Sequence, residues 1–279
     1  MNNNLVLLID SPDEAGLVFK ITKVILENSL NIISNAEFVD NEENHFFMRT
    51  EVQGNVDKGK IYNELVSALP KNAKVKISGK EKKKVVVLCT KEHHCLSDLL
   101  IRNAFGDLNI DILAVVGNHE LLKPITEKFD IPFHYISDEN ISREEHERLV
   151  IECVNQYSPE YLVLAKYMRI LSPWFVSNYS NKIINIHHSF LPAFIGANPY
   201  KQAFERGVKI IGATSHFVNN NLDEGPIIVQ EVLPVNHSYN AQDMRKAGCD
   251  VEKLALSKAL KLVFEDRVFI RKNKTVIFE

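Results

Sequence analysis

Three side chains of this sequence have the types needed to act together on a carbonyl group. Asn185 and His187 lie in INIHHSFLPAFIGANPY (184–200), where a short apolar run ends in polar residues, and Asp223 lies in the turn-like LDEG. Side chains two residues apart in an extended segment point to one face, so Asn185 and His187 are expected side by side. An amide N–H or a protonated imidazole stabilises the oxyanion formed at an attacked carbonyl, and a carboxylate accepts a proton or keeps a histidine charged. These residue types suit acyl or formyl transfer.

The same residues also have an ordinary structural interpretation. An Asn or His at the end of a strand often caps the following loop, and LDEG is a common turn. The spacing alone therefore leaves both a structural role and a hydrolase or transferase site open. Ser189 is not expected to be a nucleophile, because it does not lie in a G-x-S-x-G turn.

The composition is that of a globular protein with one large or two ordinary domains. The chain has 279 residues, of which 45% are hydrophobic and 25% charged, and its net charge is −3. This charge argues against a dedicated nucleic-acid or acidic-membrane binder. No apolar run approaches the roughly 18 residues that span a bilayer, and MNNNLVLLID has no basic signal-peptide start, so we expect a cytoplasmic protein. The four cysteines form no C-x-x-C pair, which favours buried free thiols and predicts no metal site.

The first 79 residues predict a small ferredoxin-like domain with the order βαββαβ. The expected strands are 5–9, 31–39, 45–54 and 73–77, and the expected helices are 17–28 and 61–69. Apolar residues within 17–28 recur with helical spacing. The basic, turn-rich SGKEKKK follows, and we expect residues 80–84 to form a linker.

Residues 85–279 alternate between expected strands and helices and predict a second domain. The continuous apolar run VVVLCT (85–90) is typical of a strand buried on both faces. Further strands are expected at 110–118, 161–165, 182–186, 209–218 and 226–235, with helices at 95–105, 120–129, 141–157 and about 240–265, before a closing hairpin. This α/β pattern predicts a doubly wound, largely parallel, Rossmann-like sheet. Ligands bind beyond the carboxyl ends of such strands, where Asn185, His187 and the loop 219–225 would meet.

Several motifs resemble the formyltetrahydrofolate deformylase family. NIHHSFLP resembles the N-I-H-x-S-L-L-P signature of the formyltransferase fold that uses 10-formyltetrahydrofolate, and ATSHFVNNNLDEGPIIVQ (213–230) resembles its second half. YMRILSPWFV (167–176) is similar to its folate-pocket stretch, and DSPDEAGLVFKIT resembles the ACT regulatory domain of the family. The resemblance implies an ACT domain at 1–79, a linker at 80–84 and a formyltransferase-fold catalytic domain at 85–279.

The resemblance implies an enzyme that hydrolyses 10-formyltetrahydrofolate to tetrahydrofolate and formate, which supplies formate for purine synthesis and balances the one-carbon pool. Asn185 would hold the formyl oxygen, and His187 would stabilise the oxyanion and pass a proton to the folate nitrogen. Asp223 would orient and deprotonate water and keep His187 charged, and His216 would support these groups from behind. No cofactor or metal is implied, because the folate is the substrate. The pterin pocket would be lined by Met168, Arg169, Ile170 and Leu171.

Hydrolysis is expected instead of transfer because no site for an acceptor is recognisable. CTKEHHCLSD (89–98) stands where relatives that formylate a ribonucleotide have a glycine-rich phosphate loop, and it contains no glycine, although Lys91 alone suits an anion. The extra basic domain of relatives that formylate initiator tRNA is not seen either. Water is then the expected acceptor, shielded by a rim formed by 187–200. Asn198 stands where the family more often has a basic residue, which weakens the case for a contact from there to the folate tail.

ACT domains usually pair side by side and bind an amino acid, so the resemblance implies a homo-oligomer, at least a dimer, with glycine or methionine as effector. A helix N-terminus suits a carboxylate, and Gly16 permits close backbone approach. The candidate effector contacts are Asp10, Asp13, Gly16 and Leu17. The domain could instead only join subunits. Two further functions stay open: a formyltransferase with an unrecognised amine acceptor, and an amino-acid sensor with a vestigial folate site.

Overall fold

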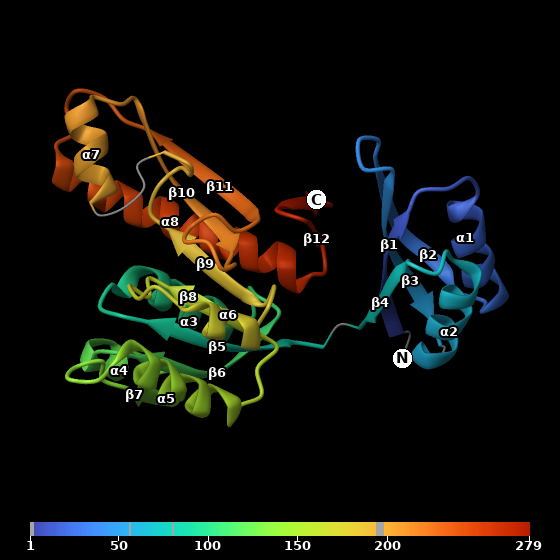
Figure 1. The fold of residues 1–279 in the computed structure, drawn as a ribbon, viewed down its shortest axis with the longest axis horizontal. Helices are drawn as coiled ribbons and strands as arrows, with labels where there is room; N and C mark the ends of the chain where they lie inside the picture. The colour runs from blue at the N-terminus through green and yellow to red at the C-terminus, as the bar shows by residue number, and fades with distance from the viewer. Residues whose placement is uncertain (1–2, 56, 80, 194–197) are drawn as a thin grey trace. The chain divides into compact units, whose positions relative to one another are not determined.

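The chain divides into two compact units, which Figure 1 shows in this computed structural model. The structure describes residues 3–55, 57–79, 81–193 and 198–279. The first unit contains the N-terminal residues up to Glu81 together with Asp266–Phe269 and Val276–Glu279. The second contains Lys82–Glu265 and Ile270–Thr275.

The N-terminal part of the first unit has the predicted order βαββαβ. Its strands form one antiparallel sheet in the order β2-β3-β1-β4. One face of this sheet packs on both helices, and the apolar helical positions Ile21 and Leu65 are buried against Leu7 and Met48. The elements are β1 (Asn3–Pro12), α1 (Leu17–Glu27), β2 (Asn31–Asp40), β3 (His45–Gly54), α2 (Lys58–Ala68) and β4 (Lys74–Ser78).

The packing on the opposite face of this sheet differs from the expected domain division. That division assigned all of 85–279 to the second domain, but residues near the C-terminus pack on the first unit. Phe47 on this face is fully buried, and its ring lies 5.4 Å from that of Phe269 in β12 (Val268–Arg271). Phe278, which follows β13 (Lys274–Ile277), stacks edge-on against Phe269 at 5.7 Å. Apolar side chains on this face have to be covered from water, and the last residues of the chain supply the cover. The expected linker is also too long, because β5 begins at Lys83.

The second unit contains the predicted mostly parallel α/β sheet. Its strands lie in the order β11-β10-β9-β8-β5-β6-β7, with β5 to β9 parallel and β10 antiparallel to both of its neighbours. The strands are β5 (Lys83–Cys89), β6 (Ile110–Gly117), β7 (Phe133–Tyr135), β8 (Tyr161–Ala165), β9 (Ile183–His187), β10 (Ile210–Phe217) and β11 (Ile227–Pro234). The sequence analysis missed β7, which has only three residues and therefore little periodicity.

Helices cover both faces of this sheet (Figure 1). On one face, Val86 and Leu88 of β5 pack with α5 and α6, whereas Val85 and Val87 point to the other face and are also fully buried. Helices α3 and α8 contact each other, and α8 packs along β9, β10 and β11. The helices are α3 (His93–Phe105), the 3-10 turn η1 (Glu120–Leu122), α4 (Lys123–Glu127), α5 (Arg143–Asn155), α6 (Pro173–Asn178), α7 (Pro199–Arg206) and α8 (Ala241–Phe264).

Two features of this architecture bear on function. The chain order reverses between β5 and β8, which places the crevice of an open α/β sheet beyond the carboxyl ends of these strands. Among the described residues, no helix combines the length and apolar character needed to cross a bilayer.

Replacing Asp266 by Ala should destabilise the first unit. The Asp266 carboxylate, 5% exposed, accepts hydrogen bonds from Lys76 Nζ at 2.6 Å and from the buried Ser78 hydroxyl at 2.7 Å. Its loss leaves the Ser78 hydroxyl without this acceptor, so we expect the free energy of unfolding to fall by about 1–3 kcal/mol. Hydrogen exchange of the β1 and β3 amides measures this change, and the exposed Glu42→Ala is the control. Equal exchange in both variants would contradict the expectation.

Candidate active site

The antiparallel pairing of β9 with β10 brings the predicted site residues together. Asn185 and His187 lie on β9, and their partners on β10 are His216 and Thr214, respectively. His187 is 6% exposed and His216 is 2% exposed, while Asn185 is half-buried. Because both strands lie inside the seven-stranded sheet, backbone hydrogen bonds hold the three polar side chains at fixed spacing.

The Asp223 carboxylate folds back onto His187, as the sequence analysis expected. Asp223 Oδ1 lies 3.3 Å from His187 Nδ1 and 3.9 Å from His216 Nε2. A carboxylate on Nδ1 holds the imidazole so that Nε2 faces away from it. His187 Nε2 is buried and has no hydrogen-bond partner among the described residues. A buried polar atom without a partner is costly, which is typical of a group that awaits a ligand.

His216 supports Asn185 more directly than Asp223. His216 Nδ1 lies 2.9 Å from the Phe217 carbonyl oxygen, which can only accept, so Nδ1 carries the hydrogen. Burial lowers the pKa of His216, and the neutral ring then accepts through Nε2 from the Asn185 amide at 3.2 Å. This bond orients the amide of Asn185 and leaves its second N–H for a ligand.

The loop after β10 is shaped to present Asp223. The residue has φ +57°, in the left-handed region that non-glycine residues rarely adopt, which is a form of strain common at functional sites. Asn219 Oδ1 accepts from the Asn221 amide at 3.0 Å, and the Asn221 side chain donates to Glu224 at 3.0 Å. A Cβ at Gly225 would lie 1.7 Å from the Phe217 carbonyl oxygen, so only glycine fits there. The asparagine run and the D-E-G turn therefore have structural roles that aim the carboxylate.

Electrostatics keep the Asp223 carboxylate ionised. Burial alone would raise its pKa, but the hydrogen bond and charge of His187, with smaller contributions from His216 and His188, outweigh burial and hold the pKa below its usual range. The neighbouring His188 has its pKa lowered to about 4, chiefly by burial and then by the charge of Lys166. The site therefore pairs an ionised carboxylate with an imidazole whose Nε2 has no hydrogen-bond partner among the described residues.

These groups open into a single cavity of about 820 Å³ in the second unit. Asn185, His187, His216 and Asp223 all line it. A cavity of this volume accommodates a ligand of folate size.

The segment expected to line a pterin pocket forms another wall of this cavity. Its backbone is fixed at both ends: the Met168 amide donates to the Thr90 hydroxyl at 2.9 Å, and the Ser172 amide donates to the buried Glu147 carboxylate at 2.7 Å. The Arg169 guanidinium is paired with Asp138, so this charge is already neutralised. The lining residues include all four expected ones, Met168, Arg169, Ile170 and Leu171.

The expected rim is described only in part. Residues 194–197 lie outside the described residues. Asn198 lines the cavity with φ +55° and precedes α7, and its side chain does not cap this helix through a hydrogen bond.

The four candidate effector residues lie together in the first unit. Asp10 is paired with His45, and the Asp13 amide donates to the Asn44 carbonyl at 2.9 Å. Gly16 has φ +88° and precedes α1, to which it adds no side-chain cap. Leu17 is buried in the core, so only its backbone can face a ligand. The start of α1 therefore lies beside these residues.

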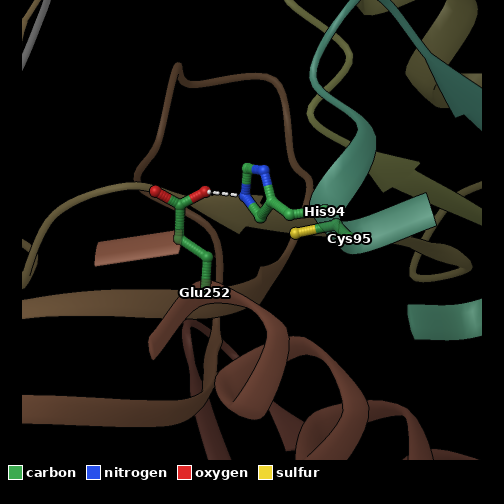
Figure 2. Close-up of side chains that lie close together, drawn as sticks. All are labelled: His94, Cys95 and Glu252. Atoms are coloured by element: carbon green, nitrogen blue, oxygen red, sulfur yellow. Dashed lines mark hydrogen bonds and ion pairs between the residues drawn. The ribbon is translucent and has the colours of Figure 1, made fainter. Parts of the chain in front are cut away.

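The sequence analysis missed a second polar cluster on the same cavity. His94 lies in the first turn of α3 and Glu252 lies on α8, and Figure 2 shows the hydrogen bond between the His94 ring and the Glu252 carboxylate. The ligand-type atoms of His94, Cys95 and Glu252 lie within 4.8 Å of one another, close enough for a metal ion. However, the Lys166 ammonium already lies 3.1 Å from the Glu252 carboxylate, and a cation would have to compete with it. The charges fit an ion-pair cluster better than a metal site.

Comparisons with known proteins agree with this geometry. Residues 83–260, well over half of the chain, match the family model described as formyl transferase. The formyltetrahydrofolate deformylase of Haemophilus influenzae is 54% identical over 272 residues, which cover 98% of each chain. The solved formyltetrahydrofolate deformylase of Pseudomonas syringae pv. tomato is 37% identical with a TM-score of 0.95, covering 99% of this chain and 95% of the other.

A more distant solved structure shares the fold. The glycinamide ribonucleotide transformylase 1 of Symbiobacterium toebii is 27% identical with a TM-score of 0.69, covering 73% of this chain and 97% of the other. The deformylases thus match this chain along nearly its entire length. The chain belongs to the formyltetrahydrofolate deformylase family of hydrolases.

Proposed function

We propose that this enzyme hydrolyses 10-formyltetrahydrofolate to tetrahydrofolate and formate. The observation that carries the proposal is the His187 imidazole, which contacts the Asp223 carboxylate through Nδ1 and lines a cavity of folate size. Its Nε2 has no hydrogen-bond partner in the described part of the chain. The membership in the deformylase family supports the same reaction. The segment 168–171 holds the pterin in this proposal, largely through its backbone. The Met168 and Ile170 side chains are exposed, Arg169 is already paired, and Leu171 packs against the core.

The reaction begins when Asp223 accepts a proton from water, whose oxygen attacks the formyl carbon. The second N–H of Asn185 and the Nε2–H of His187 hold the oxyanion that forms, as expected of fixed donors in a buried site. His187 then donates its proton to the folate nitrogen as the C–N bond breaks. The proton on Asp223 passes to His187, and the last proton of the water leaves when formic acid ionises.

His216 is a positioning residue in this scheme. Its neutral Nε2 holds the Asn185 amide, and its distance of 3.9 Å from Asp223 is too long for a hydrogen bond.

The proposed reaction needs no added cofactor, because the folate itself carries the formyl group. We propose that the formate supplies purine synthesis and that the reaction balances the one-carbon pool in the cytoplasm. We also propose that the first unit is an ACT domain, that it joins the chain into at least a dimer, and that glycine or methionine binds near the start of α1. Its βαββαβ order and the uncapped helix N-terminus after Gly16 support this assignment.

Removing either member of the central pair should abolish most of the activity. Because Asp223→Asn cannot accept a proton and His187→Ala cannot donate one, we expect each to lower kcat by about 10²–10⁴-fold. Formate release from 10-formyltetrahydrofolate measures the change, without any second substrate. The exposed His237→Ala removes an imidazole elsewhere and should retain activity. Turnover within about tenfold of the native enzyme in both site variants would refute the assigned roles.

The pKa of Asp223 should depend on His187. In the native enzyme it lies below its usual range, and in His187→Ala burial acts without the opposing hydrogen bond, so we expect the pKa to rise. A folded-state pKa below the unfolded one stabilises the fold above about pH 4, and this contribution disappears as the pH falls through the folded-state pKa. Carboxyl-labelled aspartate NMR follows the titration. An Asp223 pKa that stays equal in the two proteins would show that His187 does not hold the charge.

The proposed regulation can be tested on the same assay. Glycine or L-methionine should change the rate of formate release, and Asp13→Ala should weaken this response because the residue lies beside the start of α1. D-Methionine is the control for non-specific effects. Identical rates with and without both amino acids would remove the effector from the proposal and leave a domain that only joins subunits.

A further inference from the structure

A cluster of four buried side chains lines the cavity near the point where the strand order of the sheet reverses. His94 follows β5, Lys166 follows β8, Tyr200 lies on α7 and Glu252 on α8, and all four line the same cavity as His187. The carboxyl ends of β5 and β8 are the place where open α/β sheets bind their ligands. In this protein the four side chains line the cavity at this place.

The members of the cluster bond to one another through the Glu252 carboxylate. The Glu252 carboxylate is 1% exposed, and one of its oxygens accepts from His94 Nε2 at 2.7 Å and from Lys166 Nζ at 3.1 Å. Its other oxygen accepts from the Tyr200 hydroxyl at 2.6 Å. Burial alone would raise the pKa of Glu252, but these three partners outweigh it and lower the pKa to about 2. The carboxylate is thus ionised and fully engaged by protein donors.

Tyr200 is held in place by a glycine. A Cβ at Gly248 of α8 would lie 2.1 Å from the Tyr200 ring, so a larger residue at this position would collide with the ring. Glycine is a poor helix former, and its presence here leaves space for Tyr200. This packing brings the Tyr200 hydroxyl to Glu252.

Lys166 adopts a strained backbone conformation. Its φ of +60° lies in the left-handed region, where glycine would be unstrained and a lysine is not. The side chain is nevertheless buried, at 7% exposure, and reaches Glu252. A long charged side chain kept at a position that favours glycine points to a function for this side chain.

The cluster lies next to the catalytic pair. The His188 ring is 5.1 Å from the His187 ring and 6.4 Å from the Tyr200 ring, so it neighbours both groups. A second substrate that takes the formyl group has to reach the formyl carbon beside His187. The four side chains of the cluster line the part of the cavity next to His188.

We propose that Lys166, held by Glu252, His94 and Tyr200, fills the subsite that an amine acceptor would need, and thereby restricts the acceptor to water. This inference rests on the proposed deformylase function. The solved transformylase, which by its name acts on a glycinamide ribonucleotide, shares the fold, so the choice of acceptor must come from side chains and not from the fold. Lys166 is the residue that the geometry singles out for this choice.

The test replaces Lys166 by Gly, which removes the side chain and relieves the backbone. Glu252 keeps His94 and Tyr200 as partners in this variant. With 10-formyltetrahydrofolate and excess glycinamide, the amine nitrogen can then bond to the formyl carbon, the folate C–N bond breaks, and the amine proton ends on the folate nitrogen. We expect the ratio of formylglycinamide to formate to rise at least about tenfold over that of the native enzyme, since a positioned acceptor gains a large effective concentration.

The matched control is Lys166→Met, which keeps the bulk and the strained backbone but removes the charge. If the bulk of the side chain excludes the amine, the ratio of formylglycinamide to formate in Lys166→Met stays near that of the native enzyme. A rise of this ratio in both variants would show that the charge excludes the amine and would overturn the steric proposal. An unchanged ratio in folded Lys166→Gly would also overturn it. Lys166→Ala replaces the glycine variant if circular dichroism shows that the latter does not fold.

The outcome separates this inference from the proposed function. Formate release by the native enzyme tests the deformylase activity, whereas only the product ratio tests the role of Lys166. A native enzyme that releases no formate would end both proposals, and a native enzyme that releases formate with equal ratios in all variants would end this one alone.

Discussion

The active site depends on the contact between the Asp223 carboxylate and the His187 imidazole. The two residues are 36 positions apart, and the contact exists because β10 runs back along β9 and the following loop turns the carboxylate inward. Each part of this path has a visible constraint: a left-handed backbone at Asp223, a glycine at 225 that lies against Phe217, and an asparagine network across the turn. The contact takes up Nδ1 of His187, so Nε2, which has no partner among the described residues, is the ring nitrogen left for a ligand.

Two polar groups line the cavity, and they differ in how completely their hydrogen bonds are satisfied. Around His187, which lines the cavity, the hydrogen-bonding capacity is incomplete, because Nε2 has no partner among the residues that the structure describes. Around Glu252 it is complete, since three side chains satisfy one buried carboxylate. A buried polar group that is fully bonded stiffens a wall, whereas one that lacks a partner attracts a ligand. The same physical rule thus distinguishes the part of the cavity around His187 from the part around Glu252.

The secondary-structure pattern predicted most of both architectures. The apolar periodicity of 17–28 and the continuous run of 85–90 became α1 and β5, and the order βαββαβ was confirmed. The short elements β7, α6 and α7 were missed, because three to eight residues contain too few periods to be recognised. The domain division was wrong at the C-terminus, because the covering of Phe47 by Phe269 and Phe278 is a contact between residues more than 200 positions apart.

The sequence by itself determined the residue types and local spacing of the site: Asn185 and His187 alternate on one strand, and D-E-G forms a turn. It also determined the family, through motifs that occur along the chain. Only the tertiary structure decided that Nε2 of His216 lies nearer to Asn185 than to Asp223, and that Lys166, His94, Tyr200 and Glu252 meet. The physical reason is that alternation along a strand is a local property, whereas a buried ion pair assembled from four segments depends on how sheet and helices pack, which leaves no period in the sequence.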